Sequence, residues 1–247
     1  MNTTQSTSAV SKSRVRFNRH NGFVGPADLH EVLNIIGVGA TGSNTALIAA
    51  RMGFTHFRLW DPDIVEEHNL PNQAYDLHHV GMPKVEALAE VLLRFNPEIK
   101  VEANRKYFTA TEHAEDLEGP LILTVDTMKA RLEITDGFEG NPLVNTVFES
   151  RLGFDHGTVN IIDNLSADDL NGWRNSLLSD EEIPEGPCGL QICATMVGLI
   201  SNFLVQQLCQ KYSAVRKGTE WSPNKKTVFH YAPEGIVTYS TNKETIL

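Results

Sequence analysis

The stretch that decides the fold is Val32-Leu-Asn-Ile-Ile-Gly-Val-Gly-Ala-Thr-Gly-Ser-Asn-Thr-Ala-Leu-Ile-Ala-Ala-Arg-Met-Gly-Phe-Thr-His-Phe-Arg-Leu-Trp-Asp-Pro-Asp63. Its apolar start, residues 32–36, is typical of a buried strand. Residues 45–52 favour a helix, and the alternating residues 54–60 predict the next parallel strand. A strand, a glycine-rich turn, a helix and a second strand in this order indicate an α/β unit that binds a nucleotide.

Three glycines carry this indication, because Gly37, Gly39 and Gly42 have the G-x-G-x-x-G spacing. The first allows a tight turn, the second lets backbone N–H groups approach a phosphate, and the third lets the helix pack closely on the strand. The phosphate would lie at the positive end of the helix dipole. Asp61, which ends the second strand, is close to the offset of about 20 residues expected for a ribose-binding acid. The motif does not identify the nucleotide.

Composition restricts the class of protein. The chain has 247 residues and a formal net charge of −10, which argues against nucleic acid or an anionic membrane as the main partner. No apolar run is long enough to span a bilayer, and the N-terminus lacks the apolar stretch of a signal peptide. Three cysteines make no disulfide framework and are too few for a four-cysteine zinc site. We therefore expect a cytoplasmic protein.

The rest of the chain alternates between strands and helices up to residue 150. Strands are expected at 99–103, 120–125 and 143–148, and helices at 82–95 and 128–134. After residue 150 we expect an antiparallel segment at 153–163, helices at 166–178 and 193–210, and a hairpin formed by 228–231 and 236–239. The predicted fold is α/β and Rossmann-like, a mostly parallel doubly wound sheet with an antiparallel C-terminal extension.

Two segments fall outside this pattern. Residues 61–81 are polar and lack periodicity, and connections of that length are usually functional or disordered. Residues 14–20 form a basic patch that, on charge alone, is best interpreted as a solvated arm. We expect residues 1–13 to be a disordered tail and 14–247 a single domain, with a nucleotide-binding half at 14–150 and a substrate-side or dimer half at 151–247.

Two further residues favour a triphosphate over NAD. A triphosphate needs a lysine near its phosphates and a carboxylate for the magnesium ion that neutralises them. Lys84 opens a helix and Asp126 ends the fourth strand, so both are placed for these tasks. NAD carries less charge and needs no metal, and a magnesium carboxylate would have no purpose there.

Several separated motifs give the chain a family resemblance. They are Asp61-x-Asp63-x-Val65 followed by Asn69-Leu70-x-x-Gln73, then Gly81-x-x-Lys84, Asp126-(four residues)-Arg131, and the N-terminal Arg16-Phe17-Asn18-Arg19-His20. With these motifs the chain resembles the ThiF/MoeB/HesA group, the adenylating core of ubiquitin-activating enzymes. The resemblance covers residues 14–150 well and the remainder in outline.

The resemblance implies a set of roles. The three glycines, Asp61, Asp63, Asn69 and Gln73 would bind ATP, Lys84 would hold its phosphates, and Asp126 would bind Mg²⁺. Arg19 would enter the site of a partner subunit, which implies a homodimer. The reaction would be attack by the C-terminal carboxylate of a ubiquitin-like, β-grasp protein on the α-phosphorus of ATP. A downstream conjugating or sulfur-transfer enzyme would then receive the activated tail.

One residue departs from the family pattern, and the role of a second residue stays open. Asn72 stands where the family has an arginine, and Arg16 or Arg19 would have to compensate for the missing cation. Cys188 lies roughly where some relatives place a cysteine that takes the acyl group, and a thiolate at a helix N-terminus would be favoured there. Free cysteines are, however, usually buried small apolar residues, which is our interpretation of Cys193 and Cys209.

Some alternatives stay open. The glycine turn alone also fits an NAD-binding dehydrogenase, and Asn72 leaves room for a non-catalytic binding module of the same family. Glu149 and Arg151 end a strand near the predicted site, where they either meet the substrate tail or form an ordinary ion pair. The adjacent His78 and His79 are more consistent with a solvated loop than with a metal site.

Overall fold

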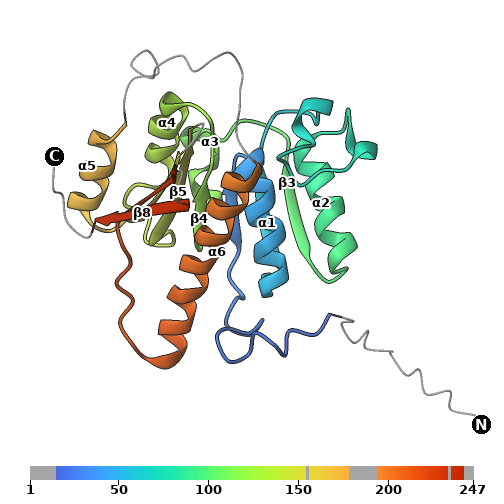
Figure 1. Ribbon diagram of the computed structural model, residues 1–247. Coiled ribbons are helices and arrows are strands. Elements are labelled where there is room, and N and C mark those ends of the chain that lie inside the picture. Colours follow the sequence, from blue (N-terminus) through green and yellow to red (C-terminus); the bar gives the residue numbers. More distant parts are fainter. Residues whose placement is uncertain (1–14, 154–155, 178–193, 233–234, 242–247) are drawn as a thin grey trace, which may run out of the picture.

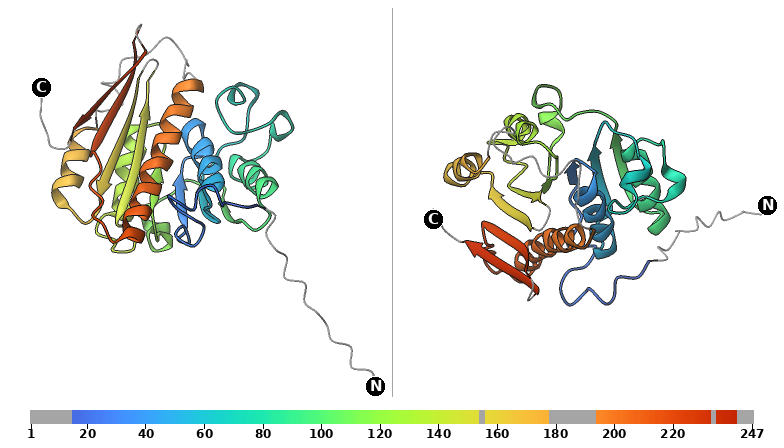
Figure 2. Two further views of the ribbon diagram at one scale, coloured as in Figure 1. Left: turned by 60° about the horizontal axis from the view of Figure 1, so that its bottom comes forward. Right: turned by 45° about the horizontal axis from the view of Figure 1, so that its top comes forward.

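The computed structural model describes residues 15–153, 156–177, 194–232 and 235–241. Within them one sheet of eight strands has the order β3-β2-β1-β4-β5-β6-β7-β8 (Figures 1 and 2). The strands are β1 Leu33–Ile36, β2 His56–Trp60, β3 Lys100–Asn104, β4 Leu121–Leu123, β5 Thr146–Leu152, β6 His156–Asp163, β7 Lys226–Ala232 and β8 Gly235–Thr241. The first five in sequence pair in parallel, and β5 to β8 pair antiparallel. The predicted fold class is confirmed.

Helices cover both faces of this sheet. The α-helices of the described residues are α1 Ala40–Met52, α2 Lys84–Phe95, α3 Ala110–His113, α4 Met128–Phe138, α5 Ala167–Asn175 and α6 Ala194–Lys217. Short 3-10 turns lie at η1 Glu67–Asn69, η2 Leu77–His79 and η3 Ala114–Asp116. α1, α2 and α6 pack on one face and α3, α4 and α5 on the other, which is the doubly wound arrangement.

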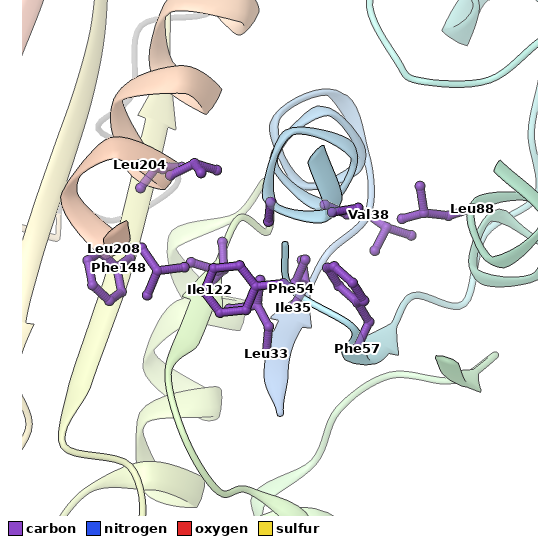
Figure 3. Packing of buried hydrophobic residues seen from close by; sticks show 14 of the residues in the cluster. Leu33, Ile35, Val38, Phe54, Phe57, Leu88, Ile122, Phe148, Leu204 and Leu208 are labelled. Carbon is purple, nitrogen blue, oxygen red and sulfur yellow. The ribbon is translucent and has the colours of Figure 1, made fainter. Parts of the chain in front are cut away.

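Alternation along the strands divides the core into these two layers. In β4, Ile122 packs with the α1, α2 and α6 layer, whereas Leu121 and Leu123 pack with the opposite layer. Figure 3 shows the first layer, where Leu204 and Leu208 of α6 lie against Phe148 and Ile122 of the sheet. Because central strands are buried on both faces, they read as nearly continuous apolar runs rather than as alternating ones.

Some boundaries differ from the sequence-based expectation. α1 starts at Ala40 instead of residue 45, because Ser43 and Asn44 do not break the helix: their side chains bond the carbonyls of Gly39 and Ala40, four residues back. β5 starts at Thr146, because residues 141–144 form a local turn in which the Val144 N–H donates to the Asn141 carbonyl at 3.1 Å. The short helix α3 was missed altogether.

The C-terminal part agrees more closely. β6 is a single antiparallel strand, and the Ser166 hydroxyl caps α5 by accepting from the Asp169 N–H at 3.3 Å, as its sequence indicates. α6 continues to Lys217, seven residues beyond the expected end at 210. In the part of the chain that is described, no helix is long and apolar enough to cross a bilayer.

Candidate functional site

The strand order reverses between β1 and β4, and the glycine turn lies at this switch point. Gly37 has φ +89°, and a Cβ built on it would come within 2.8 Å of the Thr124 carbonyl oxygen. A Cβ on Gly42 would lie 2.0 Å from the Gly37 carbonyl oxygen. Nothing lies within 4 Å of a Cβ built on Gly39, the N-cap of α1, so there is space in front of this turn. These three environments match the roles expected for a phosphate turn.

Asp61 follows β2 and closes on the glycine turn. One carboxylate oxygen accepts from the Val38 N–H at 2.8 Å and the other from the Asp63 N–H at 2.9 Å. The side chain is largely buried, and this burial raises the pKa of Asp61, although the backbone N–H donors and Lys84 act in the opposite direction. The carboxylate therefore lies beside the turn, and its role in holding a ribose stays a prediction.

Thr124 joins the glycine turn to the segment that carries Asp126. Its hydroxyl donates to the Gly37 carbonyl at 2.7 Å, and its backbone N–H donates to the Ile36 carbonyl at 3.0 Å. Asp126 lies two residues further on, exposed, between β4 and α4. The carboxyl ends of β1 and β4 therefore bring the phosphate turn and the predicted magnesium carboxylate to the same edge of the sheet.

Lys84 begins α2 at the same edge, and its side chain is mostly buried. The ammonium donates to Asp63 Oδ2 at 2.8 Å, and the Lys84 N–H donates to the Asp63 carbonyl at 2.9 Å. The carboxylate of Asp63 is half exposed, with 59% of its side-chain surface accessible. Asp63 therefore holds Lys84 in place, next to Asp61 and the glycine turn, rather than leaving it in solvent.

The segment 61–81 is ordered against α1 by hydrogen bonds. The Tyr75 hydroxyl donates to the Val38 carbonyl at 2.6 Å, and the Ala74 N–H donates to Ser43 Oγ at 3.0 Å. Asn44 Nδ2 donates to the Asn72 carbonyl at 2.9 Å. Of the two alternatives stated above, disorder is therefore wrong for this segment, and it lies beside the glycine turn as a functional loop would.

The amide side chains of this segment test whether a nucleotide fits. Asn69 Oδ1 accepts from the Glu66 N–H at 2.9 Å and so caps a 3-10 turn. The buried Oδ1 of Asn72 and Oε1 of Gln73 have no hydrogen-bond partner. Buried polar atoms are rarely left without partners, and the segment that carries these two is bonded to α1 through the Asn72 carbonyl. Both atoms are acceptors, as phosphate oxygens are, so a triphosphate would satisfy them only through donors that it brings, such as the water of its solvation shell.

Arg19 lies far from these groups. It belongs to a turn in which the His20 N–H donates to the Phe17 carbonyl at 2.9 Å. The arm then packs through Phe23 near Met52, at the C-terminal end of α1. Figures 1 and 2 show this arm at the end of the molecule opposite the segment 61–81. With α1 spanning about 20 Å, Arg19 does not reach the glycine turn of its own chain.

The cysteines separate into two groups. Cys209 is fully buried in α6, and this burial raises the pKa of its thiol to about 12, as expected for an inert core residue. Cys188 and Cys193 lie outside the described residues. The prediction of a thioester on Cys188 therefore stays a prediction.

Asp76, His78 and His79 form the one group of the described residues that could hold a metal ion by geometry. The hydrogen bonds argue against it. The Asp76 N–H donates to His79 Nδ1 at 2.9 Å, so the proton of the neutral imidazole lies on Nε2. A metal-bound histidine instead donates from its second nitrogen. The interpretation as a solvated loop holds for the exposed His78 and is wrong for His79, which is completely buried.

Glu149 and Arg151 form an ion pair. Glu149 is completely buried, and its Oε1 accepts from Arg131 Nε at 2.7 Å and from Arg151 Nε at 2.9 Å. The ion-pair alternative is correct, although the pair is buried and extends to Arg131. Sequence reasoning missed that link, and it also missed Thr124 and Tyr75. The only available signal was that Tyr75 is the single aromatic residue of a polar loop.

Known proteins resemble this chain in sequence and in fold. Ubiquitin-like modifier-activating enzyme 5 of Bombyx mori is 30% identical over 115 residues, which is 45% of this chain and 29% of that protein. The enzyme of the same name from Rattus norvegicus is 30% identical over 116 residues, again 45% and 29%. The matched part of the chain thus spans under a third of the length of these curated relatives.

Solved structures share the fold. PaaA superimposes with a TM-score of 0.68 at 20% identity, over 87% of this chain and 65% of that one. E. coli MccB with ATP gives 0.65 at 17% identity, over 88% and 65%. The E. coli tRNA N6-threonylcarbamoyladenosine dehydratase TcdA gives 0.60 at 18%, over 78% and 90%. A model of the ThiF family matches residues 29–233, and because this is well over half of the 247 residues, the chain belongs to the ThiF family.

Proposed function

We propose that the protein is an ATP- and magnesium-dependent adenylyltransferase that activates the C-terminal carboxylate of a ubiquitin-like, β-grasp protein. The observation that carries the proposal is that the glycine turn, Asp61, Lys84 and Asp126 meet at one edge of the sheet. Membership of the ThiF family and the likeness of the chain to ubiquitin-like modifier-activating enzyme 5 support it. MccB, whose structure was solved with ATP, has the same fold.

The chemistry asks little of the protein beyond positioning and charge. A carboxylate oxygen of the partner's tail forms a bond to the α-phosphorus, and the bond from that phosphorus to the pyrophosphate oxygen breaks. The products are an acyl-adenylate and pyrophosphate, and no proton has to be removed from the nucleophile. Lys84 would leave Asp63 to bind the phosphates, Asp61 would hold the ribose, and Asp126 would hold the metal. Mg²⁺ would neutralise the charge that develops on the leaving pyrophosphate.

The decisive experiment is ATP–pyrophosphate exchange with a β-grasp protein that ends in a flexible glycine-containing tail. Exchange is expected for the native chain and is expected to be abolished in Asp126→Ala. Asp136→Ala is the matched control, since Asp136 is also an exposed aspartate and lies near the far end of α4, ten residues after Asp126. Protection against heating by NAD, and not by ATP with Mg²⁺, would favour the dehydrogenase alternative instead.

A homodimer is part of this proposal, because Arg19 does not reach the site of its own chain. If Arg19 completes the partner's site, inactive Arg19→Ala and inactive Asp126→Ala proteins should regain partial exchange when mixed. In a mixed dimer one of the two sites has both residues intact, so recovery of up to a quarter of native activity is the rough statistical expectation. Absence of any recovery in proteins shown to exchange subunits would rule out the shared site.

A further inference from the structure

The carboxylate of Glu149 is the centre of a buried polar cluster. Glu149 lies in β5 and is completely buried. It accepts hydrogen bonds from four side chains on four different elements or connections: Arg131 Nε at 2.7 Å, Arg151 Nε at 2.9 Å, Trp173 Nε1 at 3.4 Å and Asn160 Nδ2. A buried carboxylate with this many donors is held in one orientation, and it has no surface left to contact a substrate.

Arg131 connects this cluster to the turn that carries Asp126. One terminal guanidinium nitrogen of Arg131 donates to the Thr127 carbonyl at 3.1 Å, and the other donates to the Ser150 carbonyl at 2.9 Å. Thr127 is the N-cap of α4, where its hydroxyl accepts from the Ala130 N–H at 3.1 Å, and it immediately follows Asp126. The guanidinium therefore ties the Asp126 turn to the end of β5.

Arg151 connects the same carboxylate to α5. Its terminal nitrogens donate to the Ser176 carbonyl at 2.8 Å and to the Ser176 hydroxyl at 2.9 Å, just past the end of α5. Trp173 of α5 reaches Glu149 directly. One carboxylate thus holds two guanidinium groups, one facing the Asp126 turn and the other facing α5. Both arginines donate to the same oxygen of this carboxylate, Glu149 Oε1.

We propose that Glu149 is a positioning residue for Asp126: it fixes the Arg131 guanidinium, which fixes the Thr127 carbonyl and thereby the direction of the neighbouring carboxylate. The inference rests on the proposed function, because it takes Asp126 to be the magnesium ligand. A residue behind a metal ligand typically changes metal affinity by 10–100-fold when it is replaced. This role would account for a glutamate buried in the middle of β5, a central strand of the sheet.

The test is Glu149→Gln, which keeps the shape of the side chain and removes its charge. Calorimetry with a non-hydrolysable ATP analogue measures how much Mg²⁺ tightens nucleotide binding relative to EDTA. We expect this enhancement to fall about tenfold in the variant, with binding in EDTA unchanged. Glu139→Gln is the matched control, because Glu139 also pairs with an arginine, Arg174, at 2.5 Å. Its side chain is 45% exposed, and this pair does not involve the turn that carries Asp126. Its enhancement should equal that of the native chain.

Hydrogen exchange provides a readout that does not depend on the proposed function. Amides of residues 124–130 should exchange about tenfold faster in Glu149→Gln, whereas those of α2 keep their protection. If α2 loses protection as well, Glu149→Gln destabilises the whole fold, and the same measurements are made on Arg131→Lys instead. This variant keeps the buried charge but cannot make the same three bonds at once.

The outcomes separate the two claims. Unchanged exchange at residues 124–130, or an unchanged magnesium enhancement in a folded variant, overturns the role of Glu149. If Mg²⁺ does not tighten binding even in the native chain, the magnesium assignment of Asp126 fails. In that case faster exchange at residues 124–130 would still show that Glu149 anchors the turn, and unchanged exchange would refute both.

Discussion

Lys84 and Asp63 are joined twice, through the ammonium and a carboxylate oxygen at 2.8 Å and through their backbones at 2.9 Å. The double link places the start of α2 against the strand end that carries Asp61. It also gives the ammonium a partner when no phosphate is present. A triphosphate carries more charge than one half-exposed carboxylate, so the ammonium can transfer to it at little cost.

The first prediction concerns this pair. Lys84→Met should weaken ATP binding by about 10–100-fold, the range expected when a hydrogen bond between charged groups is lost. Asp63→Asn should not weaken binding in EDTA, because it frees the ammonium and removes a negative charge near the phosphates. Titration calorimetry measures both constants. If Asp63→Asn weakens binding as much as Lys84→Met does, Asp63 itself contributes to nucleotide binding and is not only a partner for Lys84.

The glycine turn gives a matched pair of variants. A Cβ at Gly42 would overlap the Gly37 carbonyl at 2.0 Å, so Gly42→Ala should destabilise the fold by about 2 kcal/mol or more. Gly39→Ala meets nothing within 4 Å and should leave the stability close to native while weakening nucleotide binding. Urea unfolding and calorimetry separate the two effects. Equal stability losses in both variants would show that Gly39 is required for folding and not for ligand approach.

A pH dependence follows from the burial of Asp61. Because burial raises the pKa of this carboxyl, the folded state holds its proton above about pH 4, where the unfolded chain has lost it. The contribution of this group to the free energy of unfolding therefore falls as pH rises through the window between the two pKa values. Asp61→Asn should remove this dependence.

The measurement for Asp61 is urea unfolding of both proteins from pH 4 to pH 7. Relative to the variant, the native chain should lose stability as pH increases. The opposite slope would mean that the hydrogen bonds from the Val38 and Asp63 N–H groups outweigh burial, since those bonds favour the charged form.

Cys209 should resist alkylation in the folded protein. Its thiol has a pKa of about 12 because it is buried, and the reactive species is the thiolate. At pH 8, peptide mapping after iodoacetamide treatment should find this residue unmodified in the native chain and modified in urea. Modification in the native chain at the rate seen in urea would show that α6 opens readily from the sheet.

The sequence was a good guide to the parts whose pattern is local. The glycine spacing, the apolar runs of β1, β2 and β4, and the strong amphipathic pattern of α2 all identify their elements correctly. Each of these signals arises within about ten residues, and the sheet then forms because alternating strands and helices have few ways to pack. The meeting of Lys84, Asp61 and Asp126 at one edge of the sheet follows from that topology.

The misses depend on contacts between distant residues. Nothing near Ser43 and Asn44 in sequence shows that they will donate to carbonyls at the start of their own helix and hold residues 72–74 instead of forming a loop. Glu149 looks like a surface charge until β6 and α5 cover it, because burial is a property of the packed layers. The roles of such residues depend on partners that are 18 or 31 positions away in the sequence, beyond the reach of local patterns.

The Thr124 hydroxyl has a consequence for how the two halves of the site would respond to a ligand. It donates to the carbonyl of Gly37, and its own chain reaches Asp126 two residues later. We therefore expect a displacement of the glycine turn to be passed directly to the segment that carries Asp126. Binding of the phosphates and binding of the cation would then be coupled, so that each ligand increases the affinity for the other. The side chain of one threonine would be the physical link between the two.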